Sequence, residues 1–127
     1  MIVVDTSVWV DVIRKPTSAR AEIFRKLLDA DEVALPLPVR IELLSGVARK
    51  DRKPLIRGLS ALPVLRPTDD TWHLIESWLP SAADAGCRFA VTDLLIAGVA
   101  HELGALVWSL DADFARMENL GLVHRYQ

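Results

Sequence analysis

The sequence has a single cysteine, Cys87, and no long uninterrupted run of apolar residues. One thiol excludes an intramolecular disulfide framework and a zinc site of the CxxC type, so a reducing compartment is expected. Every apolar stretch is shorter than the ~20 residues that a membrane-spanning helix needs. The N-terminus reaches Asp5 without a basic segment, which is unlike a signal peptide. We therefore expect a cytoplasmic protein with no membrane partner.

Length and charge set the next limits. The 127 residues are 51% hydrophobic and 25% charged, which is typical of one globular domain, expected here over residues 1–127. The net charge of −2 is not that of a general nucleic-acid binder. However, residues 1–57 hold 11 of the 15 Lys and Arg but only 8 of the 17 acids. This local basic excess leaves contact with phosphates open.

Short apolar runs alternate with helical patterns along the chain. The pattern predicts strands at 2–4, 32–35, 64–65, 106–108 and 122–124, and helices at 8–13, 18–30, 39–49, 54–62, 68–79, 93–103 and 111–118. Pro80 is expected to interrupt the fifth of these helices, and Thr92 to cap the sixth. The alternation predicts a three-layer α/β/α sandwich with a short parallel sheet. Sites in such folds lie beyond the carboxyl ends of the strands.

Acidic residues follow the predicted strands or lie in the helices after them, near the carboxyl ends of the strands. Asp5 ends the first strand, Asp111 and Asp113 follow the strand at 106–108, Asp93 opens a helix, and Glu42 lies in the helix after the second strand. In a doubly wound sheet these side chains can meet at one edge. The simpler interpretation of the acids in first helical turns is a favourable interaction with the helix dipole.

Asp5 and Glu42 fit the simpler interpretation less well. A buried strand should not end in a carboxylate that has no partner. Glu42 lies in a largely apolar helix, and Gly46, one turn later, costs about 1 kcal/mol relative to Ala, which predicts that another group approaches closely there.

Carboxylates that converge repel one another, so they need a cation. All four lysines precede residue 54, and no cysteine or histidine cluster accompanies the acids. Oxygen ligands of this kind select Mg²⁺ or Mn²⁺. Such a site suits hydrolysis of a phosphodiester, because the metal lowers the pKa of water and neutralises charge in the transition state.

Four segments carry these acids: Val3 to Ser7, Ile41 to Gly46, Thr92 to Ala97 and Ser109 to Phe114. In this order and spacing they resemble the motifs of PIN-domain ribonucleases. The length and motif order resemble the VapC-type toxins of VapBC toxin–antitoxin pairs, and the resemblance covers nearly the whole chain.

The resemblance implies a Mg²⁺- or Mn²⁺-dependent endoribonuclease in which an activated water attacks phosphorus and leaves a 5′-phosphate and a 3′-hydroxyl. It implies that the metal-binding and catalytic acids are Asp5, Glu42, Asp93 and Asp111. Thr6 or Ser7 would assist them, and Asp113 would be an accessory acid. It also implies a homodimer that a VapB-type antitoxin inhibits by laying its tail across the acidic groove. Operator DNA would be bound only through that antitoxin.

A basic run surrounds Glu42 in the sequence: Arg40, Arg49, Lys50, Arg52, Lys53 and Arg57. It is interpreted either as contact with the RNA backbone or as an ordinary solvated surface. The histidines and Trp72, Trp78 and Trp108 are expected to be structural. Trp9 fits either the core or a dimer contact.

Three alternatives compete with the ribonuclease interpretation. A haloacid-dehalogenase-like phosphatase would need an acid where Ser7 stands and a lysine after Lys53, and the chain has neither. A response-regulator receiver domain would need the same lysine. A catalytically silent interaction module could lose the acids freely, so the complete acid set argues against it.

Overall fold

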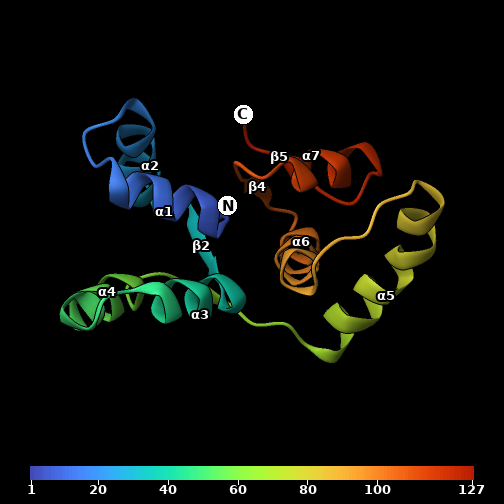
Figure 1. The fold of residues 1–127 in the computed structure, drawn as a ribbon, viewed down its shortest axis with the longest axis horizontal. Helices are drawn as coiled ribbons and strands as arrows, with labels where there is room; N and C mark the ends of the chain where they lie inside the picture. Colours follow the sequence, from blue (N-terminus) through green and yellow to red (C-terminus); the bar gives the residue numbers. More distant parts are fainter.

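The computed structural model describes residues 1–127 and contains one parallel sheet of five strands in the order β3-β2-β1-β4-β5. Its strands are β1 (Ile2–Val4), β2 (Val33–Pro36), β3 (Val64–Leu65), β4 (Leu106–Trp108) and β5 (His124–Arg125). Its helices are α1 (Thr6–Arg14), α2 (Ala19–Asp29), α3 (Leu37–Gly46), α4 (Arg52–Leu59), α5 (Asp69–Asp84), α6 (Val91–Leu103) and α7 (Ala112–Asn119), with a 3₁₀ turn at Arg49–Asp51. Helices α1 to α4 lie on one side of the sheet and α5 to α7 on the other (Figure 1). This arrangement confirms the predicted α/β sandwich.

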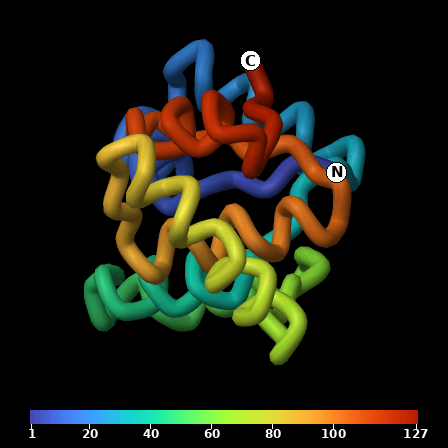
Figure 2. The backbone as a smooth tube through the Cα atoms, turned by 90° about the vertical axis from the view of Figure 1, so that its right-hand side faces the viewer, coloured from blue at the N-terminus to red at the C-terminus, as the bar shows by residue number.

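The centre of the sheet is also the centre of the core. Strand β1 runs through the middle of the molecule (Figure 2), between β2 and β4. Val3 and Val4 are fully buried, as is Val107 in the neighbouring strand. Because β1, β2 and β4 are parallel, the residues that follow them all come to the same edge of the sheet. That edge carries Asp5, the start of α3 and the segment after Trp108.

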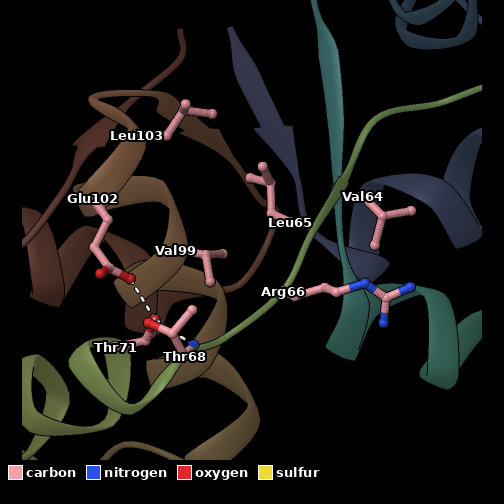
Figure 3. Close-up of a pocket in the computed structure, with 8 residues that line it drawn as sticks. All are labelled: Val64, Leu65, Arg66, Thr68, Thr71, Val99, Glu102 and Leu103. Atoms are coloured by element: carbon pink, nitrogen blue, oxygen red, sulfur yellow. Dashed lines mark hydrogen bonds between the residues drawn. The ribbon is translucent and has the colours of Figure 1, made fainter.

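Helix α6 covers the sheet, and α5 packs closely on α6. A Cβ atom at Gly98 would lie 3.1 Å from Thr71 Cγ2, so the glycine allows the two helices to approach. Thr71 is fully buried, and its hydroxyl accepts a hydrogen bond from the Thr68 amide at 2.9 Å. The same hydroxyl donates to the Glu102 carboxylate (Figure 3), which fixes the start of α5 against the end of α6.

Several local predictions were wrong. Helix α5 continues through Pro80 to Asp84, because Ile75 and Trp78 before the proline and Ala82 after it are all buried. That burial outweighs a cost of about 3 kcal/mol for an interior proline. Helix α6 begins at Val91, one residue before Thr92, with Ala90 as its N-cap.

Other differences concern side chains. Trp72 is 49% exposed and does not join the core, whereas Trp78 is buried and Trp108 is half-buried. Trp9 belongs to the core, where it packs edge-on against Phe24. No atom lies within 4 Å of a Cβ built at Gly46, so the close approach predicted there does not occur within the chain.

Helices α1, α3, α4 and α6 begin two residues earlier than predicted, and α3 and α4 end three residues earlier. Strand β5 lies at 124–125 and begins two residues later than predicted. None of the helices combines the length and the apolar character that crossing a membrane requires.

Candidate metal centre

Asp5 is held at the end of the central strand by both neighbouring segments. Its amide donates to the Trp108 carbonyl at 2.8 Å, which extends the pairing of β1 with β4 by one residue. Its side chain is only 5% exposed. The Oδ2 atom accepts hydrogen bonds from Ser7 Oγ at 2.8 Å and Ser109 Oγ at 2.7 Å. The carboxylate therefore has the partners that its burial requires, and its orientation is fixed.

The same two hydroxyls organise the backbone after β4. Ser109 Oγ accepts a hydrogen bond from the Asp111 amide at 2.9 Å, and Ser7 Oγ accepts one from the Leu110 amide at 3.0 Å. The serines thus connect the end of β1 to the loop that presents Asp111. Sequence reasoning gave Ser7 an assisting role but missed Ser109 as a positioning residue. Its place directly after a buried strand was the available signal.

Three acids form a tight group at the starts of α6 and α7. One carboxylate oxygen from each of Asp93, Asp111 and Asp113 lies within 4.8 Å of the other two. Asp111 is the N-cap of α7, and its Oδ1 atom accepts a hydrogen bond from the Asp113 amide at 2.9 Å. Asp111 therefore caps α7, and this role does not compete with a ligand role, because the carboxylate has a second oxygen.

Glu42 approaches from α3, which contacts α6. Its Oε1 atom accepts a hydrogen bond from Thr6 Oγ1 at 2.7 Å, and its side chain is exposed. Thr6 and Ser7, the first two residues of α1, therefore hold two different acids. Each of the two hydroxyls donates a hydrogen bond to one of these acids.

The charges of the four other acids act on Asp93. The pKa of Asp93 is raised from 3.8 to about 6, first by burial and then by the negative charges of Asp5, Asp111, Asp113 and Glu42. A site that raises the pKa of one carboxyl group so far favours a bound cation or a proton.

The donor set fits a hard divalent cation. All nearby ligand atoms are carboxylate or hydroxyl oxygens, and no histidine or cysteine takes part. Asp113, expected only as an accessory acid, lies in the tight group. It also forms an ion pair with Arg116, which sequence reasoning missed. Their i, i+3 spacing within one helix was the signal.

The basic residues near Glu42 are free of ion pairs within the chain. Arg49 and Lys50 lie in the 3₁₀ turn, and Arg52 and Lys53 begin α4; all four are exposed. Arg40 lies in α3, two residues before Glu42. In contrast, Arg20 and Lys15 are paired with Asp11, and the hydrogen bond from Arg20 is the main cause that lowers the pKa of Asp11.

Comparison with known proteins places this geometry in a family. The family model of the PIN domain matches residues 2–120. Ribonuclease VapC11 of Mycobacterium tuberculosis is 34% identical over 128 residues, covering 94% of this chain and 96% of the relative. The fold is similar to the crystal structure of VapBC2 from Rickettsia felis bound to a promoter DNA fragment, with a TM-score of 0.78, 20% identity and full coverage of both chains. It is also similar to DNA-bound VapBC from Salmonella typhimurium, with a TM-score of 0.79, 19% identity and coverage of 98% and 96%.

Proposed function

The chain belongs to the PIN-domain family, and from this premise we propose that it is a divalent-metal-dependent endoribonuclease, the toxin of a type II toxin–antitoxin pair. The observation that carries the proposal is the convergence of four other acids on Asp93, whose charges act together with burial to raise its pKa to about 6. Family membership also removes the phosphatase and receiver-domain alternatives. A catalytically silent module remains the competing function, and it predicts that the acids can be neutralised without effect.

Each acid has a role in this proposal. Asp5, Glu42, Asp93 and Asp111 would hold Mg²⁺ or Mn²⁺, with Asp113 as an accessory acid. When bound, the cation supplies a water of lowered pKa and neutralises charge on the phosphate. Ser7 and Ser109 keep the Asp5 carboxylate in one orientation, and Thr6 does the same for Glu42. Fixed ligands cost no reorganisation when the substrate reacts.

The proposed partners follow from the similar complexes and from the surface. The VapBC structures support a VapB-type antitoxin as partner, with operator DNA reached through it. A homodimer is supported by an exposed apolar face at α5 and the start of α6. There Trp72, Leu79 and Val91 line a cavity of about 720 Å³. A second copy of the chain would cover this face, since exposed apolar patches commonly mark interfaces.

Expression without the antitoxin tests the function. Wild-type protein is expected to arrest growth within minutes of induction and to leave new RNA ends carrying 5′-phosphates. Asp5→Asn keeps the hydrogen-bonding shape but loses the charge, so it is expected to do neither. Sequencing of RNA ends after brief expression makes the comparison. Equal arrest by the two proteins would contradict the catalytic role of the acids.

We also propose that the free basic residues Arg40, Arg49, Lys50, Arg52 and Lys53 bind the RNA backbone. Replacing Lys50 and Lys53 by Ala should reduce the slope of log K against log salt by about 1.4, since each lost phosphate contact contributes about 0.7 for single strands. The only other lysines, Lys15 and Lys26, provide a matched control pair that removes the same charge from α1–α2. Filter binding at several salt concentrations measures the slopes. Equal slopes for the two double variants would mean that the basic residues form an ordinary solvated surface and do not bind the RNA backbone.

A further inference from the structure

A small, mostly apolar cavity lies directly beside the acids, at the carboxyl edge of the sheet. Its volume is about 320 Å³, and its lining includes Ile41 and Glu42 from α3, Thr92 and Leu95 from α6, and Pro67 from the segment after β3. Two of these residues connect it to the metal centre, because Glu42 is one of the acids and Thr92 directly precedes Asp93. The cavity and the acids are therefore parts of one continuous surface.

Ile41 is the most exposed apolar residue of this cavity, with 57% of its surface open to solvent. No other element of the chain covers it. A large apolar side chain next to a polar site gains free energy when a ligand covers it. The prolines and aliphatic side chains of the lining offer flat, apolar contact, and Glu42 and Thr92 add polar groups at the rim.

Arg66 lies farther along the same edge. It follows β3 directly, precedes Pro67 of the cavity, and is exposed without an ion pair. Its side chain points away from the Glu102 carboxylate (Figure 3). In the strand order, the acids follow β1 and β4, α3 follows β2, and Arg66 follows β3. Along the edge, the cavity thus lies between the acids and a free cation.

We infer that this cavity binds one unpaired base of the RNA substrate, next to the phosphate that is cut, and that Arg66 binds the following phosphate. Single-stranded RNA alternates phosphates with flat bases, which matches the sequence of metal centre, apolar cavity and arginine. Pockets that hold an extruded base enclose its faces between aromatic or apolar side chains and bind its edge through polar groups. A paired base cannot enter, so the site selects looped or single-stranded RNA. The inference rests on the proposed ribonuclease function.

An abasic scan of the substrate tests the base site. The cut site is first mapped in cellular RNA, and an RNA spanning it is then made with one base at a time removed. With wild-type protein, we expect one position beside the cut where base removal lowers kcat/KM by about tenfold. In Ile41→Ala that penalty should shrink to a few-fold, because the cavity has lost a wall. Ile23→Ala, an exposed isoleucine of α2, is the matched control and should keep the full penalty.

Salt dependence tests the arginine. Arg66→Ala should reduce the slope of log K against log salt by about 0.7, the contribution of one phosphate on a single strand. Arg25→Ala, on α2, should leave the slope unchanged. Equal slopes for Arg66→Ala and wild type would show that Arg66 does not bind a phosphate of the RNA.

The outcomes separate this inference from the function on which it rests. If wild-type protein cuts RNA but shows no base penalty, or the same penalty in Ile41→Ala, the base site is wrong and the ribonuclease function stands. If Ile41→Ala cuts normally but loses dimerisation or antitoxin binding, the cavity takes a protein, which also overturns the inference. If wild-type protein cuts no RNA, both proposals are wrong.

Discussion

Replacing Asp93 by Asn is expected to reduce RNA cleavage to background while leaving the metal-free protein as stable as wild type, or more stable. The side chain is half-buried, and this burial, followed by the charges of four other carboxylates, raises its pKa to about 6. A rise from 3.8 to about 6 corresponds to about 3 kcal/mol, of which solvent screening at a half-exposed group leaves on the order of 1 kcal/mol. Asn removes the half-buried charge and its repulsion by the other acids, together with a metal ligand. Activity and stability should therefore change independently, which an ordinary destabilising substitution would not achieve.

The free energy of unfolding of the metal-free wild type is expected to fall as the pH rises through the pKa of Asp93. Because the pKa of Asp93 is raised in the folded state, the folded protein holds a proton that the unfolded chain has released between about pH 4 and 6. The stability that protonated Asp93 contributes to the fold is fully present below the pKa of the unfolded chain, and it is lost as the pH rises through about 6. Wild type in EDTA should therefore lose stability relative to Asp93→Asn over this window, and the difference should level off above it.

Asp70→Asn is the matched control for Asp93→Asn. Asp70 also lies in a first helical turn, but it is exposed and does not belong to the acidic group. Its loss should cost only a few tenths of a kcal/mol through the helix dipole, with activity intact. Chemical unfolding at several pH values, next to a cleavage assay, compares the three proteins. An Asp93→Asn protein that is less stable and still active would contradict the shared site.

Mn²⁺ is expected to stabilise wild-type protein strongly and Asp93→Asn weakly. A ligand that binds only the folded state adds RT ln(1 + [L]/Kd), which is about 2.7 kcal/mol at 100 times Kd. Thermal melting in EDTA and in increasing Mn²⁺ measures the shift in Tm, and Asp70→Asn should shift as wild type does. The same shift in Asp93→Asn as in wild type would place the bound metal elsewhere.

The sequence predicted that the acids lie close together because the fold has parallel strands. Parallel strands bring their carboxyl ends to one edge, so Asp5 after β1 and Asp111 after β4 had to be neighbours once the strands were recognised. The burial of Asp5 at the end of an apolar run predicted partners for its carboxylate. Those partners, Ser7 and Ser109, follow the same two strands.

Features set by packing between distant segments could not be found in this way. The burial of residues on both sides of Pro80 depends on the contact of α5 with α6, and no local rule for proline includes that contact. The cavity beside Ile41 combines three segments far apart in the sequence, and only their arrangement in space shows that it adjoins Glu42.

RNA cleavage by protein first stripped with EDTA and then supplied with Mn²⁺ tests the central claim most directly. The acids are proposed to act only through a bound cation, so wild-type protein should cut no RNA in EDTA, and added Mn²⁺ should restore cleavage. Asp93→Asn should remain inactive under both conditions. Cleavage by wild-type protein in EDTA at the rate seen with Mn²⁺, or cleavage by Asp93→Asn after Mn²⁺ is added, would contradict the account.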